Sequence, residues 1–237
     1  MAFVVSVIAW FANPAHWSGS SGVPQRLLEH LAMSAVAVTA GLLIALPVGV
    51  ALGHWGRFGN LAINVSNVGR AVPSFAILVI AFQVFGLNNY PAFVALTLLA
   101  IPPMLTNSYI GVRDVDPEVR DAARGMGMRP RRLLVDVEIP LALPLIMAGI
   151  RTAAVQVVAT ATLAALVAGG GLGRFIIDGL GQRDDAQVFA GAALVAALAM
   201  TVELGLSGLE QVALPRGLTM KSTAREVAAE PDLAVMT

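Results

Sequence analysis

Residues 71–112 read AVPSFAILVIAFQVFGLNNYPAFVALTLLAIPPMLTNSYIGV, and none of these 42 residues carries a formal charge. About 20 apolar residues are enough to cross the hydrocarbon core of a bilayer, so this stretch is too long for one span. Its middle, GLNNYP at 86–91, has the composition of a turn. The stretch therefore predicts two membrane-crossing helices joined by a short hairpin.

Uncharged stretches also cover residues 31–53 and 152–173. Hydrophobic residues make up 57% of the 237-residue chain and charged residues only 13%, whereas an average soluble domain has about 25% charged residues. We therefore predict an all-α integral membrane protein with five transmembrane helices in one bundle, the whole domain covering 27–212. The predicted spans are 27–53, 60–86, 91–112, 141–168 and 187–212.

Basic side chains are distributed unevenly between the two sets of predicted loops. Ten lie on one face, six of them arginines between residues 113 and 132, and three lie on the other face. Lys and Arg in short loops favour the cytoplasmic side, so we expect the loop at 113–139 and the tail at 213–237 inside the cell. The N-terminal segment 1–26 is then extracytoplasmic. Residues 2–12 predict an interfacial helix rather than a signal peptide or a further span.

The rest of the composition excludes several classes of protein. A formal net charge of zero argues against nucleic-acid binding, and the lack of cysteine and of paired histidines argues against a metal site. The only lysine, Lys221, follows no glycine-rich framework, so a phosphate-binding P-loop is absent from the sequence. Trp10, Trp17 and Trp55 are expected as interfacial anchors, and His30 is expected at the membrane interface.

The loop at 113–139 is strongly charged in an otherwise apolar chain. Asp116 is a good N-cap for a short helix, and Gly127 is suited to the turn that ends it. A second helix is expected from Pro130, and Pro140 is expected to open the fourth span. One interpretation is a solvated loop whose arginines only fix the topology. The spacing of its other residues favours a functional interpretation.

That spacing places Asp121-Ala122-Ala123 before Gly127 and, twelve residues further on, Ile139-Pro140-Leu141. This order resembles the EAA loop of bacterial ABC importer permeases, which has Glu-Ala-Ala, then a glycine, then Ile-x-Leu-Pro. The chain departs from that pattern in two respects. Asp121 stands in place of the glutamate, and the last three residues follow the order Ile139-Pro140-Leu141. The segments at 138–144, 149–153, 161–165 and 170–173 are similar to osmoprotectant permeases, which import glycine betaine, carnitine, choline or proline betaine. Methionine permeases share the loop, so they are the family most easily confused with osmoprotectant permeases on this evidence.

The resemblance implies a division of labour among several chains. This chain would form half of the translocation path in a bacterial inner membrane, while a separate ABC ATPase would bind ATP and Mg. An extracytoplasmic binding protein would choose the solute. Because five helices are too few to enclose a path, a second copy or a related permease is expected. The resemblance assigns ATPase coupling to Asp121, Ala122, Ala123, Gly127, Ile139 and Pro140, with the two alanines letting the partner surface approach closely.

Charged side chains inside predicted spans are costly in lipid, so they are candidate functional positions. Such side chains are found at Arg70, Arg151 and Glu203. Snorkelling to the cytoplasmic surface or packing between subunits would also explain each of them. The neutral polar candidates for lining the path are Gln83, Gln156 and Thr160.

Two glycine-containing strings have competing interpretations. The string GGGLG at 169–173 is expected to be an unwound helix end that allows close helix approach, with a substrate-contacting loop as the alternative. The string GLSG at 205–208 resembles the nucleophile segment of intramembrane serine proteases. No histidine follows Ser207 to act as its base, so small-residue helix packing is the better interpretation.

Three alternatives to an osmoprotectant permease stay open at this point. The nearest is an ABC permease for methionine or another small polar solute. An ion-driven secondary transporter would show duplicated halves and an unpaired acid deep in the membrane, and the sequence shows neither. The third is a purely structural membrane subunit.

Overall fold

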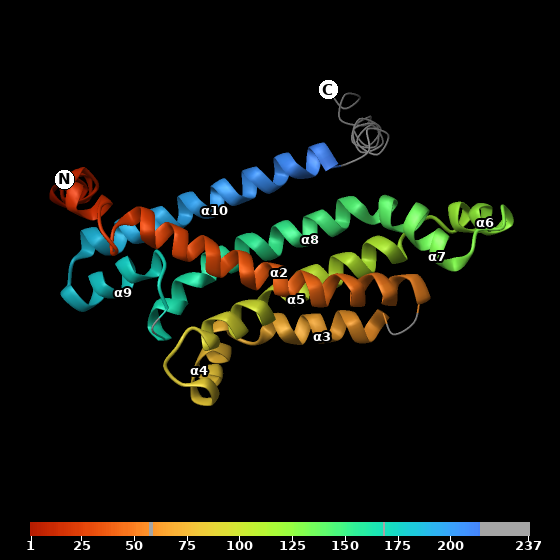
Figure 1. Cartoon of the computed structure of the whole chain (residues 1–237), viewed down its shortest axis with the longest axis horizontal. Helices are drawn as coiled ribbons and strands as arrows, with labels where there is room; N and C mark the ends of the chain where they lie inside the picture. Colours follow the sequence, from red (N-terminus) through yellow and green to blue (C-terminus); the bar gives the residue numbers. More distant parts are fainter. Residues whose placement is uncertain (57–58, 168, 214–237) are drawn as a thin grey trace, which may run out of the picture.

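The computed structural model describes residues 1–56, 59–167 and 169–213, and this part of the chain is almost entirely helical. The long helices α2 (Val23–Trp55), α5 (Tyr90–Arg113), α8 (Ile139–Thr160) and α10 (Asp185–Ala213) run roughly along the longest axis of the molecule (Figure 1). The helices α1 (Ala2–Ala12) and α9 (Gly173–Gln182) lie at one end of the molecule, and α6 (Pro117–Gly125) and α7 (Pro130–Leu133) lie at the other. The prediction of an all-α membrane protein is confirmed.

Four helical stretches of the described residues are long and apolar enough to cross a membrane: Val23–Trp55, Tyr90–Arg113, Pro130–Val167 and Asp185–Val212. They match the predicted spans at 27–53, 91–112, 141–168 and 187–212. The third stretch begins well before the predicted fourth span, because α7, the π-helical turn η2 (Leu134–Glu138), α8 and the 3-10 helix η3 (Ala161–Val167) follow one another directly.

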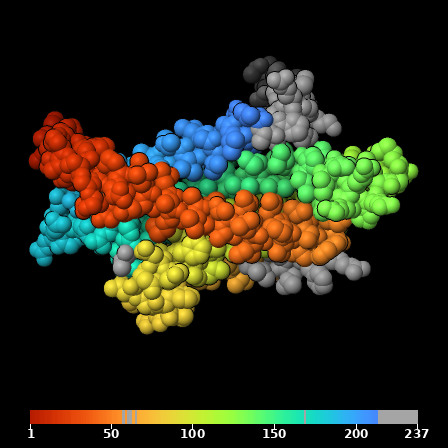
Figure 2. Space-filling view, viewed as in Figure 1, coloured from red at the N-terminus to blue at the C-terminus, as the bar shows by residue number. Residues whose placement is uncertain are grey.

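The predicted span at 60–86 is not one continuous helix. It is divided into α3 (Gly59–Ala71), with 13 residues, and α4 (Ser74–Phe85), with 12 residues. Pro73 lies at the break, where it donates no backbone hydrogen bond and disfavours a helical conformation at Val72. Each piece is about 20 Å long, which is shorter than the roughly 30 Å hydrocarbon core. In Figure 2, α4 projects from the side of the bundle.

The central packing joins α2 to α5 through small residues. A Cβ built at Gly49 would lie 2.8 Å from the carbonyl oxygen of Leu105, and one built at Gly53 would lie 2.8 Å from that of Tyr109. Because neither glycine has a side chain, the two backbones approach closely, as small residues allow in membrane helices. Gly49 and Gly53 therefore form a small-residue face of α2 against α5.

The end of the molecule that carries α1 differs from expectation in two respects. The helix α9 was not predicted, although its ten residues form a regular amphipathic helix. Trp10 is also not a free interfacial anchor, because it is buried, stacks on His16 with ring centroids 4.3 Å apart and meets Phe175 edge-on at 5.4 Å. Trp17 and Trp55 are exposed, as anchors would be.

Candidate functional site

The helix α6 forms where the sequence predicts it. Asp116 caps its start, because Oδ1 of Asp116 accepts a hydrogen bond from the backbone N–H of Glu118 at 2.8 Å. Such a cap contributes about 1 kcal/mol of helix stability. Beyond the helix, Gly127 has a φ of +81°, and its N–H donates to the carbonyl of Arg124 at 2.9 Å. The left-handed conformation of Gly127 therefore confirms the predicted turn.

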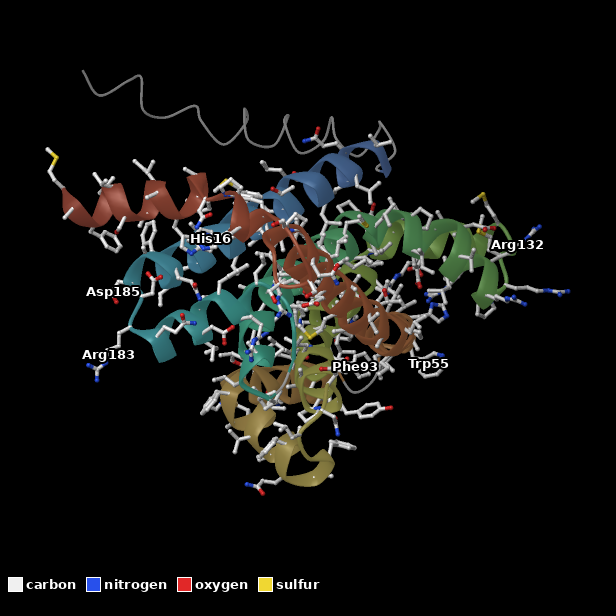
Figure 3. The ribbon with its side chains drawn as sticks, turned by 60° about the vertical axis from the view of Figure 1, so that its left-hand side comes forward. His16, Trp55, Phe93, Arg132, Arg183 and Asp185 are labelled. Atoms are coloured by element: carbon white, nitrogen blue, oxygen red, sulfur yellow. The ribbon has the colours of Figure 1, made fainter. Side chains whose placement is uncertain are left out.

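The two sides of α6 face different surroundings. Asp121, Ala122 and Arg124 are exposed, and Asp121 pairs with Arg124 at 3.1 Å within the helix. Ala123 is only 3% exposed and packs against the protein itself. The helix periodicity turns Ala123 inward and leaves Ala122 exposed, and the assignment of ATPase coupling to the two alanines stays a prediction. At this end of the molecule Arg132 projects outward, far from Arg183 and Asp185 at the other end (Figure 3).

A buried cluster of polar side chains lies beneath α6. Glu138 is fully buried, and its Oε1 lies 3.1 Å from Nε of Arg120, which makes an ion pair rather than an aligned hydrogen bond. Its other oxygen, Oε2, lies 2.5 Å from Nδ1 of His54 at the C-terminal end of α2. The guanidinium of Arg120 also donates to the backbone carbonyl of Val112 in α5. The cluster thus joins α6 to α2, to α5 and to the start of α8.

The segment between α7 and α8 places Glu138 in this cluster. Residues Leu134–Glu138 form a π-helical turn, in which the N–H of Ile139 donates to the carbonyl of Leu134. Ile139 and Pro140 are half-buried and are the first two residues of α8, so Pro140 lies at the start of this α-helix as predicted, although α8 continues the preceding helical turns without a break. Single π-helical turns inside helices are frequent at functional sites.

At the opposite end of α2, two side chains hold the glycine-rich loop at 169–173. Oε2 of Glu29 accepts hydrogen bonds from the backbone N–H of Gly171 at 2.9 Å and from Nη1 of Arg26 at 2.8 Å. Nδ1 of His30 accepts from the N–H of Leu172 at 3.3 Å, so Nε2 carries the ring proton and donates to the carbonyl of Val158 at 2.8 Å. His30 is fully buried, so its ring faces the protein interior, and its expected position at the level of the membrane interface stays a prediction.

The same loop confirms the predicted close approach at the glycines. Gly171 has a φ of +86°, and a Cβ there would lie 3.0 Å from Nδ1 of His30. A Cβ at Gly170 would collide with the side chain of Glu29. Beside this loop opens a hollow of about 800 Å³, whose wall includes Arg26, Glu29, Met33, Asn89, Phe93 and Arg174. Phe93, which is half-buried, lies near the middle of the molecule in Figure 3.

The charged residues predicted inside the spans separate into two groups. Arg151 on α8 lies 3.4 Å from Glu203 and 3.2 Å from Glu210, both on α10, so the contact is one between helices of the same chain. Arg70 is exposed in the last turn of α3. Glu210 also lies within the predicted fifth span but was not among the charged positions singled out there, and its contact with Arg151 depends on the fold.

The predicted path-lining residues lie on different surfaces. Gln83 is exposed on α4, and Gln156 is half-buried on α8. Thr160 lines a small hollow together with Ser74, Leu78 and Leu96. The hollow at Thr160 is lined by neither Gln83 nor Gln156, and the lining of a path by the three stays a prediction.

The most important residues that the sequence did not reveal are Arg120, Glu138 and His54. Glu138 had one usable signal, because it is an acid directly beside the apolar start of a span. Its partners are 18 and 84 positions away, and only the fold brings them together. Among the residues that the structure describes, no group of three or more acids and histidines is arranged to hold a metal ion. What the structure shows of the cluster is that it joins helices.

Comparison with known proteins gives one family. The model described as "Binding-protein-dependent transport system inner membrane component" matches residues 37–211. The "Carnitine transport permease protein OpuCB" of Listeria monocytogenes is 42% identical over 190 residues, which cover 80% of this chain and 87% of that protein. The "Choline transport system permease protein OpuBB" of Bacillus subtilis is 37% identical over 193 residues, which cover 81% of this chain and 89% of that protein.

Two solved structures have the same fold. An inward-facing structure of the MetNI methionine ABC transporter gives a TM-score of 0.69 at 21% identity, and covers 79% of this chain and 94% of that one. An amino acid ABC transporter with histidines gives a TM-score of 0.63 at 24% identity, and covers 80% of this chain and 92% of that one. At these identities the likeness concerns the fold.

Proposed function

This chain belongs to the binding-protein-dependent transport system inner membrane components, the permease subunits of ABC importers, and from that membership we propose that it imports osmoprotectants carrying a quaternary ammonium group. Relatives at 37–42% identity are named for the transport of carnitine, choline and glycine betaine. All three solutes share a trimethylammonium head. The single observation that carries the proposal is this agreement among relatives that match about four fifths of the chain.

The coupling surface in this proposal is the exposed side of α6. Asp121, Ala122 and Arg124 offer charged groups beside a small side chain, which suits a groove on a partner ATPase. Gly127 sets the turn that presents this surface, and the partner ATPase binds the ATP and Mg. Nucleotide-driven closure of the ATPase then moves α6 and the helices joined to it. Ile139 and Pro140 act from inside the helix that follows the turn rather than at the ATPase surface.

Selection of the solute is assigned to an extracytoplasmic binding protein. Cation–π contacts with several aromatic rings suit a quaternary ammonium group. The chain has only three Trp and two Tyr, and Trp10 is already packed against His16 and Phe175. We place the docking of the binding protein at α9 and the glycine-rich loop, where Arg183 and Asp185 are exposed.

The orientation follows from the same assignment. The end of the molecule with α6 and α7 faces the cytoplasm, and the end with α1 and α9 faces outward, across a bacterial inner membrane. Two permease subunits, either copies of this chain or this chain and a relative, enclose the path between them. Gln83, Gln156 and Thr160 are the neutral polar side chains that we propose along it.

Reconstitution into proteoliposomes tests the proposal. The chain is combined with its partner ABC ATPase and extracytoplasmic binding protein, and ATP-dependent accumulation of carnitine, choline, glycine betaine and methionine is measured. We expect accumulation of at least one quaternary ammonium solute well above that of methionine. Accumulation of methionine alone would instead favour the methionine permease alternative. Uptake driven by an ion gradient without the ATPase would favour a secondary transporter.

A further inference from the structure

We propose that Arg120, Glu138 and His54 form a buried joint that makes α6 move as one body with the ends of α2 and α5 and the start of α8. The three are positioning residues, which transmit motion from the coupling surface into the membrane helices. This inference rests on the proposed coupling role of α6. It assigns a function to three side chains that form no part of the coupling motif.

The contacts of α6 single out Arg120. Within the described part of the chain, Arg120 is the one side chain of α6 with a hydrogen bond or ion pair to another helical element. Asp116 bonds to its own helix, and Arg124 pairs with Asp121 one turn away. The polar link from α6 to the bundle therefore passes through one guanidinium, which is 8% exposed.

The partners of that guanidinium belong to separate elements. Glu138 ends the π-helical turn that leads into α8, and Val112 is near the end of α5. His54, which bonds to Glu138 rather than to Arg120, is in the last turn of α2. A displacement of α6 that kept Arg120 paired would have to move all of these elements together. A displacement that separated the pair would leave a buried carboxylate without its charged partner, which is costly inside a protein. The cluster thus favours rigid-body motion over independent movement of the loop.

Simple stabilisation is the competing explanation, and the chemistry of the site argues against it. A buried ion pair is often no more stabilising than apolar residues of the same size, because both charges lose their hydration. Apolar packing is already present nearby, where Val112, Ala142 and Ile146 form a core with Val50. In contrast to this apolar core, the charged cluster fixes one orientation of α6. The adjacent π-helical turn is the kind of feature that accompanies such functional positions.

The test uses the complete transporter in proteoliposomes, with the amount of assembled complex, the ATPase rate and the solute accumulated per ATP measured together. Glu138→Gln keeps the shape of the side chain but removes its charge. We expect the solute moved per ATP to fall about tenfold, as for the loss of a charge-assisted contact, while the basal ATPase rate is retained. Asp136→Asn is the matched control, because Asp136 lies in the same turn but is exposed, and it should behave as the wild type.

A double variant separates transmission from stability. Arg120→Gln with Glu138→Gln removes both charges, so no unpaired ion is left buried. If the cluster only stabilises the fold, the double variant recovers both assembly and transport. We expect it to recover assembly while the solute moved per ATP stays low. Wild-type transport per ATP in the double variant would overturn the inference. Absence of ATP-dependent transport by the wild type would instead count against the proposed function.

A distance measurement reports on the rigid body directly. The chain contains no cysteine, so spin labels can be attached at Trp55→Cys on α2 and Met126→Cys after α6, both of which are exposed. Labelled chain is assembled with an excess of unlabelled chain, so that the measured distance lies within one subunit. We expect this distance to be the same with and without ATP in the wild type. In the Arg120→Gln, Glu138→Gln background we expect the distribution of distances to broaden. A nucleotide-dependent change in the wild type would refute the joint.

Discussion

Gly127 offers a prediction whose magnitude follows from the backbone alone. Its φ is +81°, and a Cβ built there would have no heavy atom within 4 Å. A side chain at 127 therefore meets no obstacle, and the cost of replacing glycine is the left-handed conformation itself. For alanine this cost is about 1–2 kcal/mol, and for asparagine it is smaller because its polar side chain tolerates that region. Proline adds a fixed negative φ and the loss of the N–H bond to Arg124.

The expected consequence is a defined order of activities. A penalty of about 1–2 kcal/mol lowers the population of the native turn relative to its alternatives by a factor of about 5–30. If uptake follows the fraction of loops in the docking conformation, it should decrease from glycine to asparagine, alanine and proline at position 127. Proline should abolish uptake while the protein remains inserted in the membrane.

The assay is ATP-dependent solute uptake, normalised to the amount of chain in the membrane. Gly125→Ala is the matched control, because Gly125 is the last residue of α6, has no positive φ and also has nothing near a Cβ. It should retain wild-type uptake. If alanine at position 127 performs better than asparagine, side-chain volume rather than backbone conformation decides the outcome, and the reasoning fails.

Three further predictions concern other contacts. Ala123→Leu should destabilise the purified chain by about 1–3 kcal/mol, because Ala123 is buried. Ala122→Leu should leave the melting temperature unchanged and weaken ATPase binding, because Ala122 is exposed. Equal melting temperatures of the two variants would show that the two sides of α6 do not differ in this way. Glu29→Gln should speed hydrogen exchange at the amide of Gly171, measured by mass spectrometry, because the charged acceptor is lost; unchanged exchange would show that Glu29 does not hold the loop. Gly49→Ala should lower the melting temperature, because its Cβ would lie 2.8 Å from a carbonyl oxygen, while Gly205→Ala should not, and equal shifts would refute the close contact of α2 with α5.

The sequence predicted most of the membrane helices because apolar composition is a strong and local signal. The helices at 27–53 and 91–112 are found within a few residues of their expected ends. The division of the predicted span at 60–86 was missed, because Pro73 lies in an uncharged stretch and hydropathy does not register a break in backbone hydrogen bonding. The helix α9 was missed because it is amphipathic and too short to span a membrane.

The candidate site was predicted only where its residues are neighbours in the sequence. The cap at Asp116 and the turn at Gly127 depend on local backbone geometry, and both were anticipated. The inward orientation of Ala123 was not anticipated, because which face of α6 is buried depends on the bundle beneath it. The cluster of Arg120, Glu138 and His54 was not anticipated either. A contact between residues separated by 84 positions requires the fold.

Site-specific cross-linking from α6 to the ATPase tests the central claim most directly. Single cysteines are placed at Ala122 and Ala123 in the otherwise cysteine-free chain, and cross-linking to the partner ATPase is measured in the assembled transporter. The exposed position 122 should cross-link efficiently, and the buried position 123 should not. The contrary result is normal ATP-driven uptake by a transporter in which no cross-link to the ATPase forms from position 121, 122, 123 or 124. That result would contradict the claim that this helix couples the permease to its energy source.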